Sequence, residues 1–101
     1  MHVLLVDDEE ELVVTLAERL SLRDIDADWA LSGEEALKIM KAAGDKYGLK
    51  TLTEVMDSAH CQLVSDYVDG LQVGARNFQN FSLLKNIGKV TKDSHKMVLF
   101  K

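Results

Sequence analysis

The sequence predicts a small α/β protein of the flavodoxin-like, doubly wound class, built around a parallel five-stranded sheet. The chain has 101 residues, which suits a single domain over residues 1–101. Short apolar runs alternate with helical patterns of apolar residues along the whole sequence. Five strand-like runs separated by four helices make a (βα)4β chain that lacks the last helix. This order requires parallel strands joined by right-handed crossovers.

The chain begins with the pattern of a strand followed by a helix. Residues 3–6 are a continuous apolar run, typical of a strand that is buried on both faces. Asp7 or Asp8 is expected to cap the helix that follows. One face of that helix is apolar, with Leu12, Val13, Leu16 and Leu20.

The second strand has the pattern of a sheet edge. Apolar and acidic side chains alternate over residues 25–31, which indicates that one side of this strand lies near water. A capping box at residues 32–35 opens the second helix, and Gly48 is expected to end it. Because an edge position suits the second strand, we favour the strand order 2-1-3-4-5. A half-barrel of order 1-2-3-4-5 is the alternative.

The second half of the chain supplies the remaining elements. Strands are expected at residues 49–56, 71–75 and 97–100. Asp57 or Ser58 is expected to cap the third helix, and Asn77 the fourth, which ends at Gly88.

Without a fifth helix, one face of the sheet would be partly bare. Exposed apolar sheet seeks a partner, so we expect a homodimer through this face. Trp29, Phe78 and Phe81 are expected to lie in the core, together with Cys61.

The composition excludes several classes of protein. The net charge of −5 gives no overall attraction to nucleic acid or to an anionic membrane. Cys61 is the only cysteine, so an internal disulfide and CxxC metal sites are excluded. No apolar run has the length of a spanning helix, and acids follow Val6 where a signal peptide would continue. We therefore expect a soluble, cytoplasmic protein.

Two motifs near the start carry a family likeness. Val3-Leu4-Leu5-Val6-Asp7-Asp8-Glu9 and Ser32-Gly33-Glu34-Glu35-Ala36-Leu37, at this spacing, resemble a response-regulator receiver domain over residues 1–40. In that family an acidic pair holds Mg²⁺, and an aspartate that ends the third strand accepts a phosphoryl group. The resemblance implies a Mg²⁺ site at Asp7 and Asp8, with helix capping as the alternative. The phosphoacceptor is not matched, because the third strand offers Glu54 instead.

A second likeness covers residues 42–101. It rests on Asp45-Lys46-Tyr47-Gly48, Thr53-Glu54-Val55-Met56-Asp57, Gln72-Val73-Gly74-Ala75-Arg76-Asn77-Phe78-Gln79-Asn80-Phe81 and Val98-Leu99-Phe100-Lys101. These segments resemble part of a 3-deoxy-D-arabino-heptulosonate 7-phosphate (DAHP) synthase. That family is a TIM barrel that condenses phosphoenolpyruvate with erythrose 4-phosphate on a divalent metal.

The DAHP synthase resemblance implies the remnant of a phosphoenolpyruvate site. It makes Arg76 a ligand of the phosphate, assisted by backbone N–H groups near Ala75, and it places Glu54 in the same pocket. Lys101 matters because both families place a lysine at the end of this strand. The alternative for Arg76 is an ordinary surface arginine without a ligand. The alternative for Lys101 is a frayed chain end. The metal ligands of that family lie on other strands, so no catalytic residue is assigned.

The two resemblances meet at residues 38–43 and lead to one main hypothesis. The chain would be an engineered chimera, receiver-like over residues 1–41 and DAHP-synthase-like over residues 42–101; the absence of proline agrees with design. Such a scaffold is not an enzyme and requires no cofactor, and it retains weak phosphate or Mg²⁺ binding at the carboxyl edge of its sheet. Two alternatives stay open: a divergent receiver in phosphorelay signalling, and an inactive DAHP synthase fragment.

Overall fold

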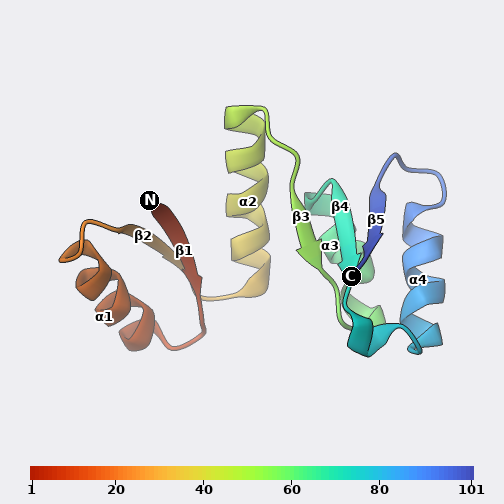
Figure 1. Ribbon diagram of the computed structural model, residues 1–101, viewed down its shortest axis with the longest axis horizontal. Coiled ribbons are helices and arrows are strands. Elements are labelled where there is room, and N and C mark those ends of the chain that lie inside the picture. The colour runs from red at the N-terminus through yellow and green to blue at the C-terminus, as the bar shows by residue number, and fades with distance from the viewer. The chain divides into compact units, whose positions relative to one another are not determined.

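The computed structural model describes all residues, 1–101, as two compact units. Unit 1 is Met1–Ile39 and unit 2 is Met40–Lys101. Both are mixed α/β structures with parallel strands, which confirms this coarser part of the predicted class (Figure 1). No helix in either unit has the length and apolar character needed to cross a membrane.

Unit 1 is a single βαβ motif followed by the start of a helix. Its elements are β1 (His2–Val6), α1 (Glu10–Ser21), β2 (Asp26–Ala30) and the first part of α2 (Gly33–Tyr47). β1 and β2 are parallel neighbours, and their register runs from the His2–Asp26 pair to the Val6–Ala30 pair. Val13 and Ala17 of α1 are buried, as is Ala30 at the end of β2.

The helix ends of this half follow the sequence signals with one shift. The side chain of Ser32 accepts a hydrogen bond from the backbone N–H of Glu35 at 3.1 Å, which confirms the capping signal that opens α2. α2 ends at Tyr47, and Gly48 adopts a positive φ of 64°, as expected for a helix stop. The predicted cap of α1 is wrong in detail. Asp7 instead closes a tight turn by accepting the N–H of Glu9 at 2.9 Å, one residue before α1 begins.

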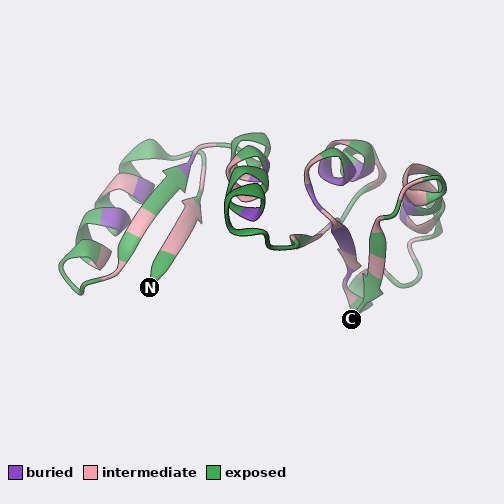
Figure 2. Cartoon of the chain, turned by 90° about the horizontal axis from the view of Figure 1, so that it is seen from above, coloured by how far each residue is buried: buried purple, intermediate pink, exposed green.

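Unit 2 is a three-stranded parallel sheet with helices on one face. After the end of α2 come β3 (Leu52–Glu54), the 3₁₀ turn η1 (Ser58–His60), α3 (Cys61–Tyr67), β4 (Gly70–Val73), the 3₁₀ turn η2 (Ala75–Asn77), α4 (Phe81–Thr91) and β5 (Met97–Phe100). The strand order is β3-β4-β5. α3 and α4 contact each other and lie side by side on the same face of the sheet (Figure 2).

The core of unit 2 is centred on β4, the middle strand. Leu71 and Val73 of β4 are completely buried, and Leu83 and Ile87 of α4 are buried as well. Cys61 is fully buried at the start of α3, as predicted. These side chains are aliphatic or small, so the core contains no aromatic ring.

The three aromatic residues predicted to be core are not buried. Trp29 is 40% exposed, Phe78 41% and Phe81 67%. Trp29 lies in β2 of unit 1, and Phe81 is the first residue of α4, so neither is enclosed between the helices and the sheet of unit 2. Phe78 instead packs edge-on against Phe100, with ring centroids 5.6 Å apart.

The predicted five-stranded sheet is not formed. β1 and β2 make one sheet, while β3, β4 and β5 make another, so neither the order 2-1-3-4-5 nor the half-barrel order is present. The pairs of β1 with β2, β3 with β4 and β4 with β5 are confirmed. β3 spans three residues instead of the predicted eight.

The cap of the fourth helix is also corrected. Asn77 belongs to η2, and the side chain of Asn80 caps α4 by accepting the N–H of Leu83 at 3.2 Å. α4 then continues past Gly88 to Thr91. The intervening 3₁₀ turn therefore shifts the helix start by one turn from the first asparagine to the second.

Candidate functional site

The carboxyl edge of the three-stranded sheet brings together the predicted phosphoenolpyruvate residues of unit 2. Glu54 is the last residue of β3 and pairs with Gln72 of β4. β4 leads through Gly74 into η2, which contains Ala75 and Arg76. Because parallel strands end at the same edge, this edge is where ligands bind in open α/β sheets.

Arg76 and Glu54 form the one direct contact among the predicted site residues. Nη2 of Arg76 lies 3.4 Å from Oε2 of Glu54 and donates to Sδ of Met56 at 2.8 Å. The Arg76 side chain is 65% exposed, whereas Glu54 is 29% exposed. Nη1 and Nε of Arg76 make no hydrogen bond within the protein, so they remain available to an anion.

Lys101 follows β5 at the same edge. Its backbone N–H donates to the carbonyl of Val73 at 3.0 Å, which extends the ladder between β4 and β5 by one residue. Its side chain is exposed and makes no ion pair with Glu54. The backbone of Lys101 is therefore held at the sheet edge while the ammonium group is free.

A second polar pair lies in the turn after β3. Asp57 accepts the backbone N–H of His60 at 3.0 Å and so caps the 3₁₀ turn η1, not α3 as predicted, because α3 begins after His60. Nδ1 of His60 lies 2.7 Å from Oδ1 of Asp57. This side-chain hydrogen bond lowers the pKa of Asp57, with a further contribution from the backbone bond. Ser58 is linked to Ser82 of α4 by a 3.0 Å hydrogen bond between the two hydroxyls.

Asp7 and Asp8 lie in unit 1, after the end of β1. The backbone N–H of Asp7 donates to Ala30 at 3.2 Å, and its carboxylate accepts the N–H of Glu9. The structure contains no group of three or more His, Cys, Asp or Glu side chains arranged to hold a metal ion. The side chains present therefore do not match the ligand set that a catalytic divalent metal requires.

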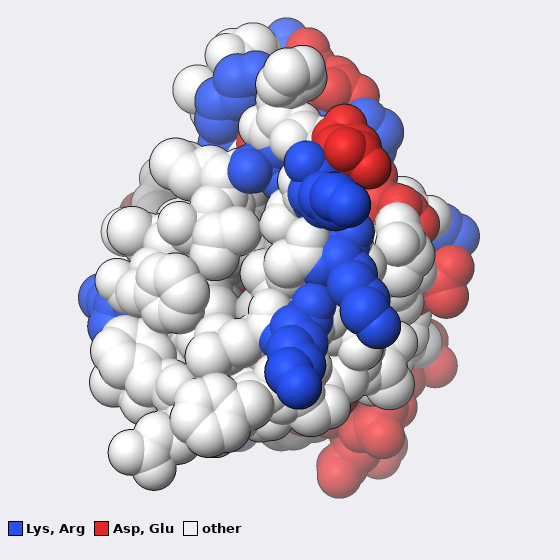
Figure 3. All heavy atoms as spheres, turned by 90° about the vertical axis from the view of Figure 1, so that its right-hand side faces the viewer, with Lys and Arg blue, Asp and Glu red and all other residues white.

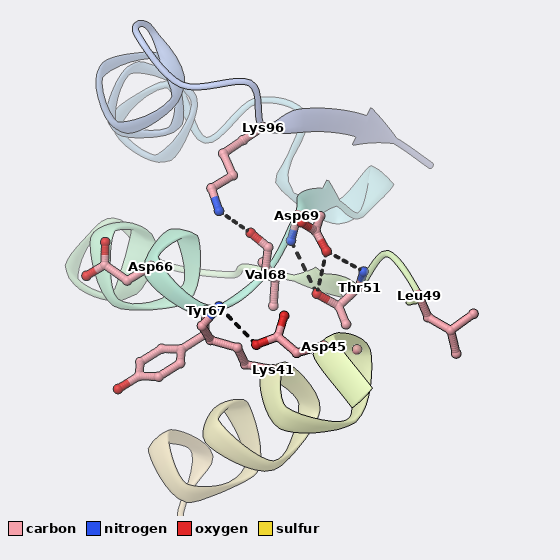
Figure 4. A pocket seen from close by; sticks show the side chains of 10 residues that line it. Lys41, Asp45, Leu49, Thr51, Asp66, Tyr67, Val68, Asp69 and Lys96 are labelled. Atoms are coloured by element: carbon pink, nitrogen blue, oxygen red, sulfur yellow. Dashed lines mark hydrogen bonds and ion pairs between the residues drawn. The ribbon is translucent and has the colours of Figure 1, made fainter. Parts of the chain in front are cut away.

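The amino edge of the same three-stranded sheet carries a small polar cavity of about 50 Å³ (Figure 4). Asp69, directly before β4, accepts the N–H of Thr51 at 2.8 Å and its hydroxyl at 3.2 Å. Lys96, directly before β5, donates to the carbonyl of Val68 at 2.7 Å. These contacts tie together the starts of all three strands, at the edge opposite to Glu54 and Arg76.

Charge is divided unequally between the units. Eleven of the 17 acidic residues lie in unit 1, whereas nine of the 12 basic residues lie in unit 2. Lys and Arg atoms form a band on the side of the molecule that carries α4 (Figure 3). Unit 2 therefore has a net positive charge.

Sequence reasoning missed three features of these edges. Met56 beside Arg76, the space that Gly74 leaves for Glu54, and the bonds between Thr51 and Asp69 all depend on neighbours distant in sequence. The sequence did contain a pattern that could have predicted the bonds between Thr51 and Asp69. Polar residues stand directly before three consecutive strands, at Thr51, Asp69 and Lys96.

The comparisons with known proteins agree with one another. Residues 26–101 match the DAHP synthetase I family. The chain is 42% identical over 60 residues to a phospho-2-dehydro-3-deoxyheptonate aldolase of Thermotoga maritima, a match that covers 59% of this chain and 18% of the relative.

Solved structures of the same kind align with almost the whole chain. A truncated DAHP synthase from Thermotoga maritima aligns over 98% of this chain and 38% of its own, with 31% identity and a TM-score of 0.62. A phospho-2-dehydro-3-deoxyheptonate aldolase from the same organism aligns over 99% of this chain and 31% of its own, with 28% identity and a TM-score of 0.61. The chain thus spans well under half the length of these relatives.

These matches correct two expectations from the sequence. The expectation that the protein is not an enzyme is contradicted, because the family, the curated relative and the solved structures are all DAHP synthases. The receiver-like half of a chimera is not supported, because the family match begins at residue 26, inside that half. Since the match extends from there to Lys101, the chain belongs to the DAHP synthetase I family.

Proposed function

We propose that this chain provides the phosphoenolpyruvate-binding edge of a DAHP synthase. The observation that carries the proposal is the placement of Arg76, which is held by Glu54 at the carboxyl edge of β3, β4 and β5 with two nitrogens left free. The family membership supports it, because the residues concerned lie within the matched range.

The chemistry of this edge suits a small dianion. An arginine can donate two parallel hydrogen bonds to phosphate oxygens, and the first N–H groups of η2, beginning at Ala75, have no acceptor within that turn. The ammonium group of Lys101 adds a second positive charge at the same edge. Glu54 neutralises part of the charge of Arg76 and fixes its position, so that substrate binding does not have to order a free side chain.

The complete reaction needs more than this edge provides. The family resemblance implies condensation with erythrose 4-phosphate and a divalent metal, which polarises the substrate carbonyl when it is bound. The side chains described above do not form a ligand set for that metal. We therefore assign no step of the reaction to these residues beyond binding and orienting phosphoenolpyruvate.

Calorimetric titration of the full chain with phosphoenolpyruvate tests the proposal. We expect a Kd of roughly 1 mM, equivalent to about −4 kcal/mol, and at least about tenfold weaker binding by Arg76→Ala, since a charge-assisted hydrogen bond contributes about 1.5–3 kcal/mol. Lys89→Ala is the control, because Lys89 is an exposed cation in the last turn of α4. Equal affinity in Arg76→Ala and the unmodified chain, or an equal loss in Lys89→Ala, would contradict the proposal.

A second candidate function concerns Asp7 and Asp8 in unit 1. These two adjacent carboxylates, at the carboxyl end of β1, would bind Mg²⁺ weakly and leave several of its waters in place. Titration with Mg²⁺ should shift the NMR signals of residues 7–9 in the unmodified chain and in Asp26→Asn, but not in Asp8→Asn; no shift in the unmodified chain excludes this site.

A further inference from the structure

Glu54 uses its two carboxylate oxygens on two different neighbours. Oε2 faces the guanidinium of Arg76 at 3.4 Å. Oε1 lies against the backbone of Gly74, so close that a Cβ placed on that residue would overlap with it. The carboxylate therefore occupies the space that any other residue at position 74 would fill with its side chain.

The backbone does not require glycine at this position. Gly74 has φ −71° and ψ 152°, an extended conformation that alanine adopts without strain. Gly48 differs, because its positive φ of 64° favours glycine for conformational reasons. Space, and not backbone freedom, is therefore the physical reason for a glycine at position 74.

We infer that Gly74 is a positioning residue for the anion site: its missing side chain lets the Glu54 carboxylate lie where it holds Arg76 toward the ligand. The inference rests on the proposed function for the identity of the ligand, phosphoenolpyruvate. The contact of Gly74, Glu54 and Arg76 does not depend on it, because the three residues meet in the protein without any ligand.

The structure separates this role from a role in folding. The only side chain that a Cβ at position 74 would meet within 4 Å is that of Glu54, whose carboxylate is the far end of a flexible side chain. Gly74→Ala should therefore displace the carboxylate at little expense to the fold. Gly88→Ala is a matched control, since a Cβ at residue 88 meets nothing within 4 Å.

The test combines a double-mutant cycle with a direct signal from Arg76. Phosphoenolpyruvate affinity is measured for the unmodified chain, Gly74→Ala, Glu54→Ala, the double variant and Gly88→Ala. The ¹H–¹⁵N signal of the Arg76 Nε–H group is recorded for each without ligand, and it is assigned by its loss in Arg76→Ala. The chain has three arginines, so few signals overlap.

We expect Gly74→Ala to bind about tenfold more weakly, as for the loss of one charge-assisted contact. The double variant should bind phosphoenolpyruvate with an affinity within about twofold of that of Glu54→Ala, since without Glu54 no carboxylate is left to displace. Gly74→Ala and Glu54→Ala should each move the Arg76 signal, and Gly88→Ala should move neither the signal nor the affinity.

Two results overturn the inference: an Arg76 signal that is unchanged in Gly74→Ala, or an equal loss of affinity on Gly74→Ala with and without Glu54. If the unmodified chain does not bind phosphoenolpyruvate, the proposed function fails instead. The Arg76 signal alone then decides whether Gly74 positions Glu54 and Arg76.

Discussion

Asp69 shows how a single carboxylate links the pH of the solution to the starts of two strands. Its side chain accepts the backbone N–H of Thr51 at 2.8 Å and the hydroxyl of the same residue at 3.2 Å. The backbone hydrogen bond lowers the pKa of Asp69 most, with a further contribution from the hydroxyl. A carboxyl group with a lowered folded-state pKa stabilises the fold above the unfolded value of about 3.9, and this contribution is lost as the pH falls through the folded pKa.

We therefore expect Asp69→Asn to lower the urea midpoint of unfolding at pH 7. The difference from the unmodified chain should shrink as the pH falls below about 4, because both side chains are then uncharged. Asp93→Asn is the control, since Asp93 is exposed in the loop after α4 and its carboxylate accepts no hydrogen bond within the protein. A difference of the same size at every pH from 2 to 7 would refute the role of the ionised carboxylate.

Residue-scale signals in the sequence were reliable where both partners lie within one turn of the chain. The cap at Ser32 and the helix stop at Gly48 both appear in the structure. Asp57 also acts as a cap, but of η1 and not of the predicted helix. The placement of Glu54 beside Gly74 could not be predicted in this way, because it depends on the register of β3 against β4.

The secondary structure elements were predicted more securely in number than in extent. All five strands and four helices occur, because each has its own apolar periodicity. β3 was predicted over residues 49–56, because apolar residues flank it on both sides. Only Leu52–Glu54 pair with β4. The candidate site was identified from the resemblance to DAHP synthases, and not from periodicity.

β4 is the element on which the stability of unit 2 depends most. Leu71 is fully buried in its middle, so Leu71→Ala should lower the free energy of unfolding by about 2–5 kcal/mol. Leu99→Ala on the neighbouring β5 removes the same atoms from a side chain that is 40% exposed and should cost about 1 kcal/mol or less. Equal losses in urea titrations of the two variants would show that β4 is not the centre of this core.

The whole molecule differs most from what the sequence suggested. The strands form two sheets, and the predicted five-stranded order is not shown. The local pattern of a strand predicts that the strand exists, but it does not encode which distant strand lies beside it. The resemblance to DAHP synthases predicted the family correctly over residues 42–101, but the family match begins at residue 26. Short motifs identified these relatives, whereas the match begins in a stretch whose motif at residues 32–37 was assigned to a receiver domain.

Exposed apolar side chains lead to an expectation for the assembled state. Leu52 of β3 and Met97 and Leu99 of β5 are all exposed and lie on the same face of the three-stranded sheet. Burying exposed apolar surface against a second copy of the chain is favourable, so we still expect a homodimer through this sheet face. Light scattering at micromolar concentration should give twice the mass of the chain, and Leu99→Asp should reduce it to the mass of one chain. A monomeric mass for the unmodified protein contradicts this expectation.

An NMR titration of the ¹⁵N-labelled full chain with phosphoenolpyruvate locates the ligand that the proposed function requires. We expect the shifted signals to belong to Glu54, residues 74–77 and Lys101, at the carboxyl edge of the three-stranded sheet. Inorganic phosphate should shift fewer of them and at higher concentration, because it lacks the carboxylate of the substrate. A well-dispersed spectrum that phosphoenolpyruvate leaves unchanged, or shifts confined to the lysines of α4, would contradict a phosphoenolpyruvate site at this edge.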